Sequence, residues 1–302
     1  MDNVGKKYVF SFLGGDSRQA IIAGELRNKG HDVKLFGLEE YISYCPDGQH
    51  CMSMEKALED SEILILPLPV SRDNEHLSIA NSEKIPLKYI IKLCIKNEIN
   101  IIFGGMLPEA FINNCKINGI DAFDYYKVEE LQQKNALPSA EGALMLAMEH
   151  SEITVHNMNA LVSGYGRIGS RLAAMLLALG ANVTVAARRD ETICEAVLSG
   201  YNAIKINSAK GEDWLNGYTF DVIFNTVPEK IFNSGVLRKL QNKPLYIEIA
   251  SNPGGIECSA ARDIGIKIIS APSLPGRYSP ITAGKYIFET ISSLCIERGI
   301  AI

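Results

Sequence analysis

A glycine-rich turn near the middle of the chain has the spacing of a dinucleotide-binding loop. Gly164, Gly166 and Gly169 form a GxGxxG pattern. The first glycine permits a tight turn, the second lets the backbone approach a pyrophosphate, and the third lets a helix pack closely on the preceding strand. The pyrophosphate would accept hydrogen bonds from free N–H groups at the positive end of that helix. The residues expected to bind the cofactor here are Gly164, Tyr165, Gly166, Arg167, Ile168 and Gly169.

The segments on either side of the turn have the order that a dinucleotide fold requires. Residues 160–163 form a short apolar run, residues 170–179 are amphipathic with helical spacing, and residues 182–187 form a second apolar run. Strand, turn, helix and strand therefore follow one another. The alternative, a glycine turn with only a structural use, would not require this sequence of elements.

The residues after 182–187 indicate which dinucleotide is bound. Proteins that prefer NAD usually place a carboxylate about twenty residues beyond the glycines, where it binds the ribose 2′-OH. This chain has Ala187, followed by Arg188 and Arg189. A guanidinium suits a 2′-phosphate because its fork of donors matches phosphate oxygens. We therefore expect NADP as the cofactor, the alternative being that both arginines are merely solvated at the end of a strand.

A further set of cofactor-binding candidates follows the strand expected at 219–227. Small polar side chains at the end of a strand, followed by a proline, suit a position beside the nicotinamide ribose. The candidates in this segment are Asn225 and Thr226, which are polar, and the Val227 and Pro228 that follow them.

Composition excludes several classes of protein. The 302 residues carry a formal net charge of -5, and the basic residues are scattered, which argues against a nucleic-acid or membrane-surface face. No apolar run approaches the ~20 residues of a bilayer span, and no signal-type cleavage site follows the amino terminus, so we expect a cytoplasmic protein. The seven cysteines include no CxxC pair and are expected to be buried thiols. Cys45, His50 and Cys51 share one loop, but three ligands on one loop do not make a standard zinc site, and we expect no metal.

The order of strands and helices predicts an α/β protein of two doubly wound domains. The first, residues 1–136, is expected to be flavodoxin-like or Rossmann-like with five strands, and the second, residues 137–278, to be a six-stranded NADP-binding Rossmann domain. Two interdomain helices are expected to link them. One begins near Leu137 with Ser139 as its cap and its amino end in the cleft, and the other, residues 279–302, returns to the first domain.

Four segments resemble the family of bacterial dipicolinate synthase A subunits. They are GGDSRQ at 14–19, PSAEGA at 138–143, SGYGRIGSRLA at 163–173 and APSLPGRYSPITAG at 271–284. The resemblance implies oxidation of dihydrodipicolinate to pyridine-2,6-dicarboxylate during sporulation, with hydride transfer to NADP+, in the cytoplasm of the mother cell. It also implies a B subunit that resembles flavoproteins, and we expect a homo-oligomer.

A dicarboxylate substrate needs hydrogen-bond donors at both ends. Our candidates lie at expected strand and helix ends that face the cleft, although each arginine could instead form a surface ion pair. The candidates for substrate binding are Gly14, Gly15, Arg18, Arg72, Ser139, Ser273 and Arg277. Asp16 and Ser17 could simply cap the helix that follows the first glycine turn.

The catalytic acid or base is less defined by the sequence. His76, Asp16 and Glu141 are candidates because they lie near the expected cleft, and loss of the proton to water is the alternative. Two other functions use the same fold: an NAD(P)-dependent dehydrogenase of a small 2-hydroxy or amino acid, and a sensor or scaffold protein that binds NADP(H) without chemistry. The first requires a histidine–carboxylate pair beside the nicotinamide, and the second a site without arginines.

Overall fold

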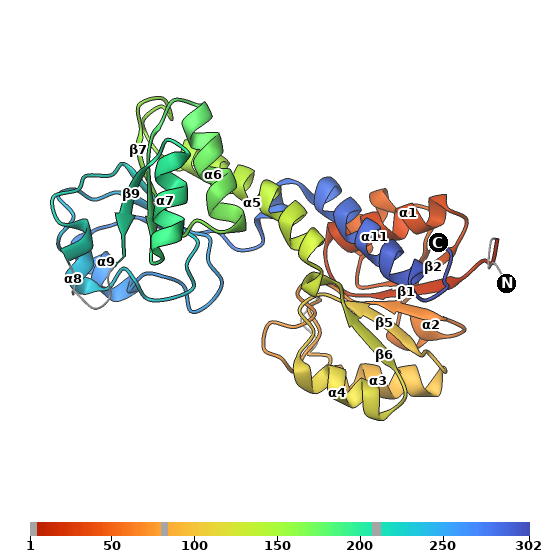
Figure 1. The fold of residues 1–302 in the computed structure, drawn as a ribbon. Helices are drawn as coiled ribbons and strands as arrows, with labels where there is room; N and C mark the ends of the chain where they lie inside the picture. Colours follow the sequence, from red (N-terminus) through yellow and green to blue (C-terminus); the bar gives the residue numbers. More distant parts are fainter. Residues whose placement is uncertain (1–4, 80–83, 207–212) are drawn as a thin grey trace. The chain divides into compact units, whose positions relative to one another are not determined.

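The protein consists of two compact α/β units, each built on its own parallel sheet (Figure 1). The structure, a computed structural model, describes residues 5–79, 84–206 and 213–302. Unit 1 comprises Met1–Asn135 and Ser279–Ile302, and unit 2 comprises Ala136–Tyr278. The chain therefore crosses between the units twice, once within a long helix and once just before the last helix.

The sheet of unit 1 has six strands where we expected five. Its strands are β1 (Val9–Leu13), β2 (Asp32–Phe36), β3 (Gln49–His50), β4 (Ile63–Ile65), β5 (Ile101–Gly104) and β6 (Asp121–Asp124). They are all parallel, in the order β3-β2-β1-β4-β5-β6. The five expected strands alone have the flavodoxin-like order, and β3 extends it to the order of a dinucleotide fold. Sequence reading missed β3 because two polar residues form no apolar run.

Helices cover both faces of this sheet. They are α1 (Ser17–Asn28), α2 (Met54–Leu58), α3 (Leu87–Lys96), α4 (Glu109–Ile117) and α11 (Pro280–Ile296). The last helix packs along α1, so the carboxyl-terminal segment belongs to the core of unit 1. Gly284 permits this close approach, because a Cβ there would lie 2.9 Å from Cγ2 of Ile21.

The sheet of unit 2 repeats the same topology. Its strands are β7 (Asn159–Ser163), β8 (Asn182–Ala187), β9 (Asn202–Lys205), β10 (Val222–Asn225), β11 (Leu245–Glu248) and β12 (Ile268–Ser270). The order is β12-β11-β10-β7-β8-β9, all parallel. Strand β9 was not expected from the sequence. The order reverses between β7 and β10, and in open parallel sheets ligands bind at the carboxyl ends of the strands beside such a reversal.

The helices of unit 2 enclose two apolar layers, one on each face of the sheet. They are α6 (Arg167–Ala178), α7 (Asp190–Leu198), α8 (Ser234–Leu237), α9 (Cys258–Ile264) and α10 (Leu274–Tyr278). Strands β7 and β10 are buried along nearly their whole length, as expected for central strands covered on both faces.

The long helix α5 (Glu129–His150) corrects our expectation of a helix that begins near Leu137. Pro138 lies inside it, although proline cannot donate to the Lys134 carbonyl and is commoner in a first turn. The preceding turns are supported by Lys134, whose Nζ lies 2.7 Å from Glu130 and 2.8 Å from Glu289. Ser139 is therefore a buried residue within a helix and not an N-cap.

Within the described residues, no helix is long and apolar enough to cross a membrane. No group of three or more His, Cys, Asp or Glu side chains in the described ranges is placed to hold a metal ion, and this includes the loop of Cys45, His50 and Cys51. All seven cysteines are free, with Cys194 and Cys258 exposed and the other five buried.

Candidate functional site

The glycine turn connects β7 to α6 at the point where the sheet order reverses. Gly164 has φ +88° and donates its N–H to the carbonyl of Ala186 at 2.8 Å. A Cβ on Gly164 would overlap Oγ1 of Thr226, and a Cβ on Gly169 would overlap the carbonyl oxygen of Gly164. The turn therefore has room for a side chain at neither position.

Gly166 differs from its two neighbours in the pattern, and its surroundings fit a pyrophosphate. It is the N-cap of α6, and no side chain among the described residues caps the first turn of this helix. A Cβ built on Gly166 would meet no atom of the described residues within 4 Å, so these residues leave the space beside the start of α6 open. Open space next to the N–H groups at the start of a helix is what a pyrophosphate needs.

The other residues of the turn divide between the interior and solvent. Tyr165 and Ile168 are half-buried against the core of unit 2, and the rings of Tyr165 and Tyr201 meet edge to face with centroids 5.9 Å apart. Arg167 is exposed in the first turn of α6. Tyr165 and Ile168 thus pack the turn against the core of unit 2, while the side chain of Arg167 is exposed.

The two arginines that follow β8 differ in their contacts. Ala187 is buried, and Arg188 forms an ion pair between Nη1 and Oε2 of Glu229, with both side chains more than half exposed. Arg189 is the exposed N-cap of α7, and its guanidinium has no partner among the described residues. The sequence pointed to both arginines, but Glu229 lies after a different strand and was not among the candidates.

Asn225, a cofactor-binding candidate, is fully buried and committed to internal hydrogen bonds. Its Oδ1 accepts from Oγ of Ser163 at 2.7 Å and from N–H of Val227 at 3.1 Å. Its Nδ2 donates to the carbonyl of Val227 at 2.9 Å and to Oε1 of Glu248 at 2.6 Å. Asn225 therefore shapes the loop after β10, and the exposed part of that loop begins at Pro228.

Thr226 lies directly over the glycine turn. Its Oγ1 donates to the carbonyl of Ser163 at 2.8 Å. Its position against Gly164 ties the loop after β10 to the turn after β7. The two segments that border the order reversal are thereby held together.

Glu248, at the end of β11, completes this polar network and was missed in the sequence. Besides Asn225, its Oε2 accepts from N–H of Gly255 at 2.7 Å and from the hydroxyl of Tyr246 at 3.3 Å. Burial, reinforced by the Glu248 charge, raises the pKa of Tyr246, which therefore stays a neutral donor. A carboxylate ending the apolar strand LYIE was the available signal in the sequence.

In unit 1, the Gly14–Gly15 turn does not offer the donors we expected for a substrate carboxylate. The N–H of Gly14 donates to the carbonyl of Phe36 at 2.8 Å, and the N–H of Gly15 donates to the carbonyl of Ser78 at 3.1 Å. The segment around Ser78 lies on the turn, since a Cβ on Gly14 would lie 2.7 Å from the Ser78 carbonyl oxygen. Both N–H groups are engaged within the protein.

Arg18 is 4% exposed and forms an ion pair with Asp16. Asp16 also caps α1 by accepting from N–H of Arg18 at 3.0 Å, so the capping role considered for it is present. The Arg18 Nη2 donates to the carbonyl of Leu68 at 2.5 Å. Burial lowers the pKa of Arg18, but the hydrogen bond and charge of Asp16 more than offset this, and the net shift is upward. Arg18 is a structural cation in this arrangement.

Arg72 and His76 lie in the loop after β4. Arg72 is exposed. His76 Nδ1 lies 2.8 Å from Oδ2 of Asp73, whose other oxygen accepts from N–H of Glu75 and of His76. These backbone and imidazole hydrogen bonds hold the pKa of Asp73 well below its usual range. Asp73, absent from our candidates, therefore orients the imidazole of His76 and leaves Nε2 without a partner among the described residues.

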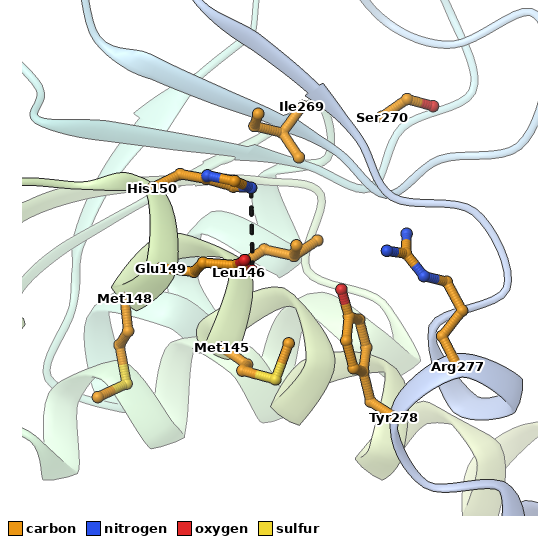
Figure 2. A pocket seen from close by; sticks show the side chains of 9 residues that line it. All are labelled: Met145, Leu146, Met148, Glu149, His150, Ile269, Ser270, Arg277 and Tyr278. Carbon is orange, nitrogen blue, oxygen red and sulfur yellow. Dashed lines mark ion pairs between the residues drawn. The ribbon is translucent and has the colours of Figure 1, made fainter.

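The remaining candidates belong to unit 2. Ser139 and Glu141 lie on α5, the former buried and the latter exposed. Ser273 is exposed with φ +56° just before α10. Arg277 lines a hollow of about 810 Å³ between the end of α5 and β12, beside Tyr278 and facing His150 and Glu149 (Figure 2). None of the other candidates lines this hollow.

Both halves of the chain match known protein families. Residues 9–126 match the family model for the N-terminal domain of the dipicolinate synthase A subunit, and residues 153–259 match the model "Putative NAD(P)-binding". The dipicolinate synthase A subunit of Bacillus subtilis is 30% identical over 292 residues, which cover 94% of this chain and 95% of that protein.

Solved structures give the same picture. The crystal structure of the dipicolinate synthase A chain from Bacillus subtilis has a TM-score of 0.80 at 28% identity, covering 97% of both chains. The crystal structure of the corresponding protein from Bacillus halodurans has a TM-score of 0.81 at 26% identity, covering 95% of this chain and 97% of the other. A transhydrogenase from Sinorhizobium meliloti, 12% identical with a TM-score of 0.65, covers 95% of this chain and 91% of that one and shares the fold.

The NAD(P)-binding match and the relatives assign a nicotinamide cofactor and a dehydrogenase-like enzymatic role, both in agreement with the open, uncapped turn at Gly166. The length of the match leaves no large part of the chain outside it. The chain belongs to the family of dipicolinate synthase A subunits.

Proposed function

We propose that the protein oxidises dihydrodipicolinate to pyridine-2,6-dicarboxylate and passes the hydride to NADP+. The observation that carries this proposal is the cofactor side of unit 2, where an open glycine turn and two arginines follow neighbouring strands β7 and β8. Family membership supports the substrate, since the relatives are dipicolinate synthase subunits.

The residues present fit NADP in three places. The first-turn N–H groups of α6 beside Gly166 would hold the pyrophosphate, and Arg188 with Arg189 would hold the 2′-phosphate. The loop Thr226–Pro228 would lie along the nicotinamide side. A bound NADP+ supplies the hydride acceptor, and the protein orients the ring that loses the hydride.

The substrate loses two hydrogens from neighbouring ring atoms, one as hydride and one as a proton. The electron pair of the C–H bond that loses its proton forms the new ring double bond, so the products are the aromatic ring, the reduced cofactor and one proton. Arg72 and Arg277, both exposed, stand as donors for the two carboxylates, with Ser139 and Ser273 as further polar candidates. For the proton, His76 is the favoured acceptor because Asp73 already orients its ring.

The proposal also includes the biological setting. The relative from Bacillus subtilis is named as one lettered component of a synthase, which supports a second component as partner. We propose that this partner is a flavoprotein-like B subunit and that the chain also associates with copies of itself. We place the protein in the cytoplasm of the mother cell during sporulation.

Cofactor titration by calorimetry tests the proposal first. We expect NADP+ to bind the intact chain at least tenfold more tightly than NAD+, and we expect this preference to disappear in an Arg188→Ala, Arg189→Ala double variant. Production of NADPH from freshly generated dihydrodipicolinate then tests the reaction. Equal affinity for the two cofactors would contradict the NADP assignment, and tight NADP+ binding without turnover would leave a protein that binds the cofactor without chemistry.

A further inference from the structure

The ion pair between Arg188 and Glu229 crosses the end of the strand that carries the glycine turn. Arg188 follows β8 and Glu229 follows β10, and β7 lies between these two strands in the sheet. Neighbouring strands are about 4.8 Å apart, so the ends of β8 and β10 are separated by roughly 10 Å. The two side chains bridge that gap over the carboxyl end of β7, where the Gly164 turn emerges.

The pair is weak enough to open, while Glu229 itself is held near the site. The two side chains are 54% and 57% exposed, and ion pairs this exposed contribute little in water. The loop that carries Glu229 is fixed by its neighbours. The carbonyl of Glu229 accepts from N–H of Ile231 at 2.7 Å, and Nζ of Lys230 donates to the carbonyl of Ile256 at 2.7 Å. Opening the pair therefore leaves the Glu229 carboxylate close to Arg188.

We propose that Glu229 sets the cofactor preference of this protein by competing with the 2′-phosphate of NADP for Arg188. This inference rests on the proposed function, in which Arg188 and Arg189 bind that phosphate. A 2′-phosphate must take the guanidinium from Glu229 and then remain beside a like charge. NAD carries a hydroxyl at the same position, which leaves the ion pair intact and can donate to a carboxylate. Glu229 therefore weakens binding of NADP and narrows its advantage over NAD.

Arg189 provides the contrast within the same site. Its guanidinium has no partner among the described residues, and the next residue, Asp190, is engaged with Lys205 at 2.6 Å. Arg189 can therefore meet a 2′-phosphate without breaking an ion pair. The competition is confined to Arg188.

The test is calorimetric titration of the full chain with NADP+, NAD+ and adenosine 2′,5′-bisphosphate, which carries only the adenosine half of the cofactor. In Glu229→Gln, we expect fivefold to tenfold tighter binding of NADP+ and of the bisphosphate at low salt, with NAD+ changed by less than twofold. In Glu229→Lys, the gain should be larger still. Both gains should shrink near 0.5 M salt, because the charges are exposed and screened.

Glu195→Gln is the matched control, because Glu195 is an exposed carboxylate on α7 whose loss changes the net charge equally. It should leave all three affinities within twofold. Thermal unfolding of each variant checks that the fold is intact. Unchanged or weaker NADP+ binding in both Glu229 variants would overturn the proposal.

The failure of this inference can be separated from failure of the proposed function. If the Arg188→Ala, Arg189→Ala variant keeps the NADP+ preference of the parent, the phosphate site is elsewhere and both proposals fall. If that variant loses the preference while the Glu229 variants bind NADP+ like the parent, the cofactor assignment holds and only the competition is wrong.

Discussion

The guanidinium of Arg18 donates two hydrogen bonds to the carboxylate of Asp16, from Nε to Oδ1 at 2.9 Å and from Nη2 to Oδ2 at 2.7 Å. Arg18 is buried, whereas about a third of the Asp16 side chain is exposed. Removing the carboxylate would leave a buried cation without its counter-charge, which is more costly than losing the pair as a whole.

We therefore expect Asp16→Ala to lower the free energy of unfolding by about 3 kcal/mol, measured by urea denaturation. Asp16→Asn keeps an oxygen that can cap α1 and should lose less. Replacing both residues, as in Asp16→Asn with Arg18→Met, should recover part of the loss because no buried charge remains. Equal losses in Asp16→Ala and in the double variant would show that the buried charge is not the cause.

Substitutions at Gly166 and Gly169 should affect cofactor binding and stability separately, although both glycines lie in the same turn. A Cβ at position 166 meets no atom of the described residues within 4 Å, whereas one at 169 overlaps the backbone carbonyl of Gly164. Gly166→Ala should keep the melting temperature within about 2 °C and weaken NADP+ binding at least tenfold, because the methyl group takes the space of the pyrophosphate. Gly169→Ala should lower the melting temperature by several degrees, since backbone must move. Differential scanning fluorimetry and calorimetry measure the two effects, and unchanged binding in Gly166→Ala would place the pyrophosphate elsewhere.

Much of the fold around the glycine turn could be predicted from sequence because its signals are local. The run 182–187 coincides with β8, and the glycine spacing located the start of α6 to within a few residues. The missed elements lack such signals. Edge strand β3 has only two residues, both polar, and β9 has two polar residues among four. The true start of α5 was hidden because Pro138 resembles a first-turn proline.

The candidate site was harder to predict because its contacts join distant parts of the chain. Arg188 and Glu229 are 41 positions apart, and Ser163 and Asn225 are 62 positions apart. Each pairing follows from strand order, which single residues do not reveal. Sequence reading therefore found Arg188 and Asn225 but not the partners that decide what each of them does.

The Glu248 carboxylate offers a test of the network behind the loop after β10. Its two oxygens accept from Nδ2 of Asn225 and from N–H of Gly255 at 2.6 and 2.7 Å. In Glu248→Gln, one arm becomes an NH2 group, which cannot accept, so a donor is left unpaired. We expect a loss of about 2 kcal/mol in the free energy of unfolding, measured by urea denaturation.

Glu257→Gln serves as the comparison for Glu248→Gln. Oε2 of Glu257 also accepts from a backbone N–H, that of Ser234, but Glu257 does not bind Asn225. It should lose less than about 1 kcal/mol, because the amide oxygen that the variant retains can still accept from the Ser234 N–H, so no donor is left unpaired. Similar small losses in both variants would mean that the Glu248 network adds little stability.

We expect the stability of the protein to depend on pH because of His31. It is buried, and its Nδ1 accepts from N–H of Tyr8 at 3.3 Å, while its ring lies against Phe10 with centroids 5.4 Å apart. Burial, aided by the positive charge of Lys29, lowers the pKa of His31 below its ordinary value of 6.5. The folded protein therefore favours neutral imidazole.

The lowered pKa of His31 makes the free energy of unfolding fall as the pH falls. Above pH 6.5 the imidazole is neutral in both states, and the stabilisation by His31 is fully present. As pH falls below 6.5, the unfolded chain takes up a proton that the folded protein resists, so stability falls by up to about 1.4 kcal/mol per pH unit until the folded pKa is reached. The comparison is with His31→Gln, which keeps an acceptor for the Tyr8 N–H but does not titrate. Urea unfolding at pH 7.5, 6.5, 5.5 and 5.0 should show the advantage of the parent over this variant shrinking below pH 6.5, and a constant difference across the series would mean that His31 is protonated equally in both states.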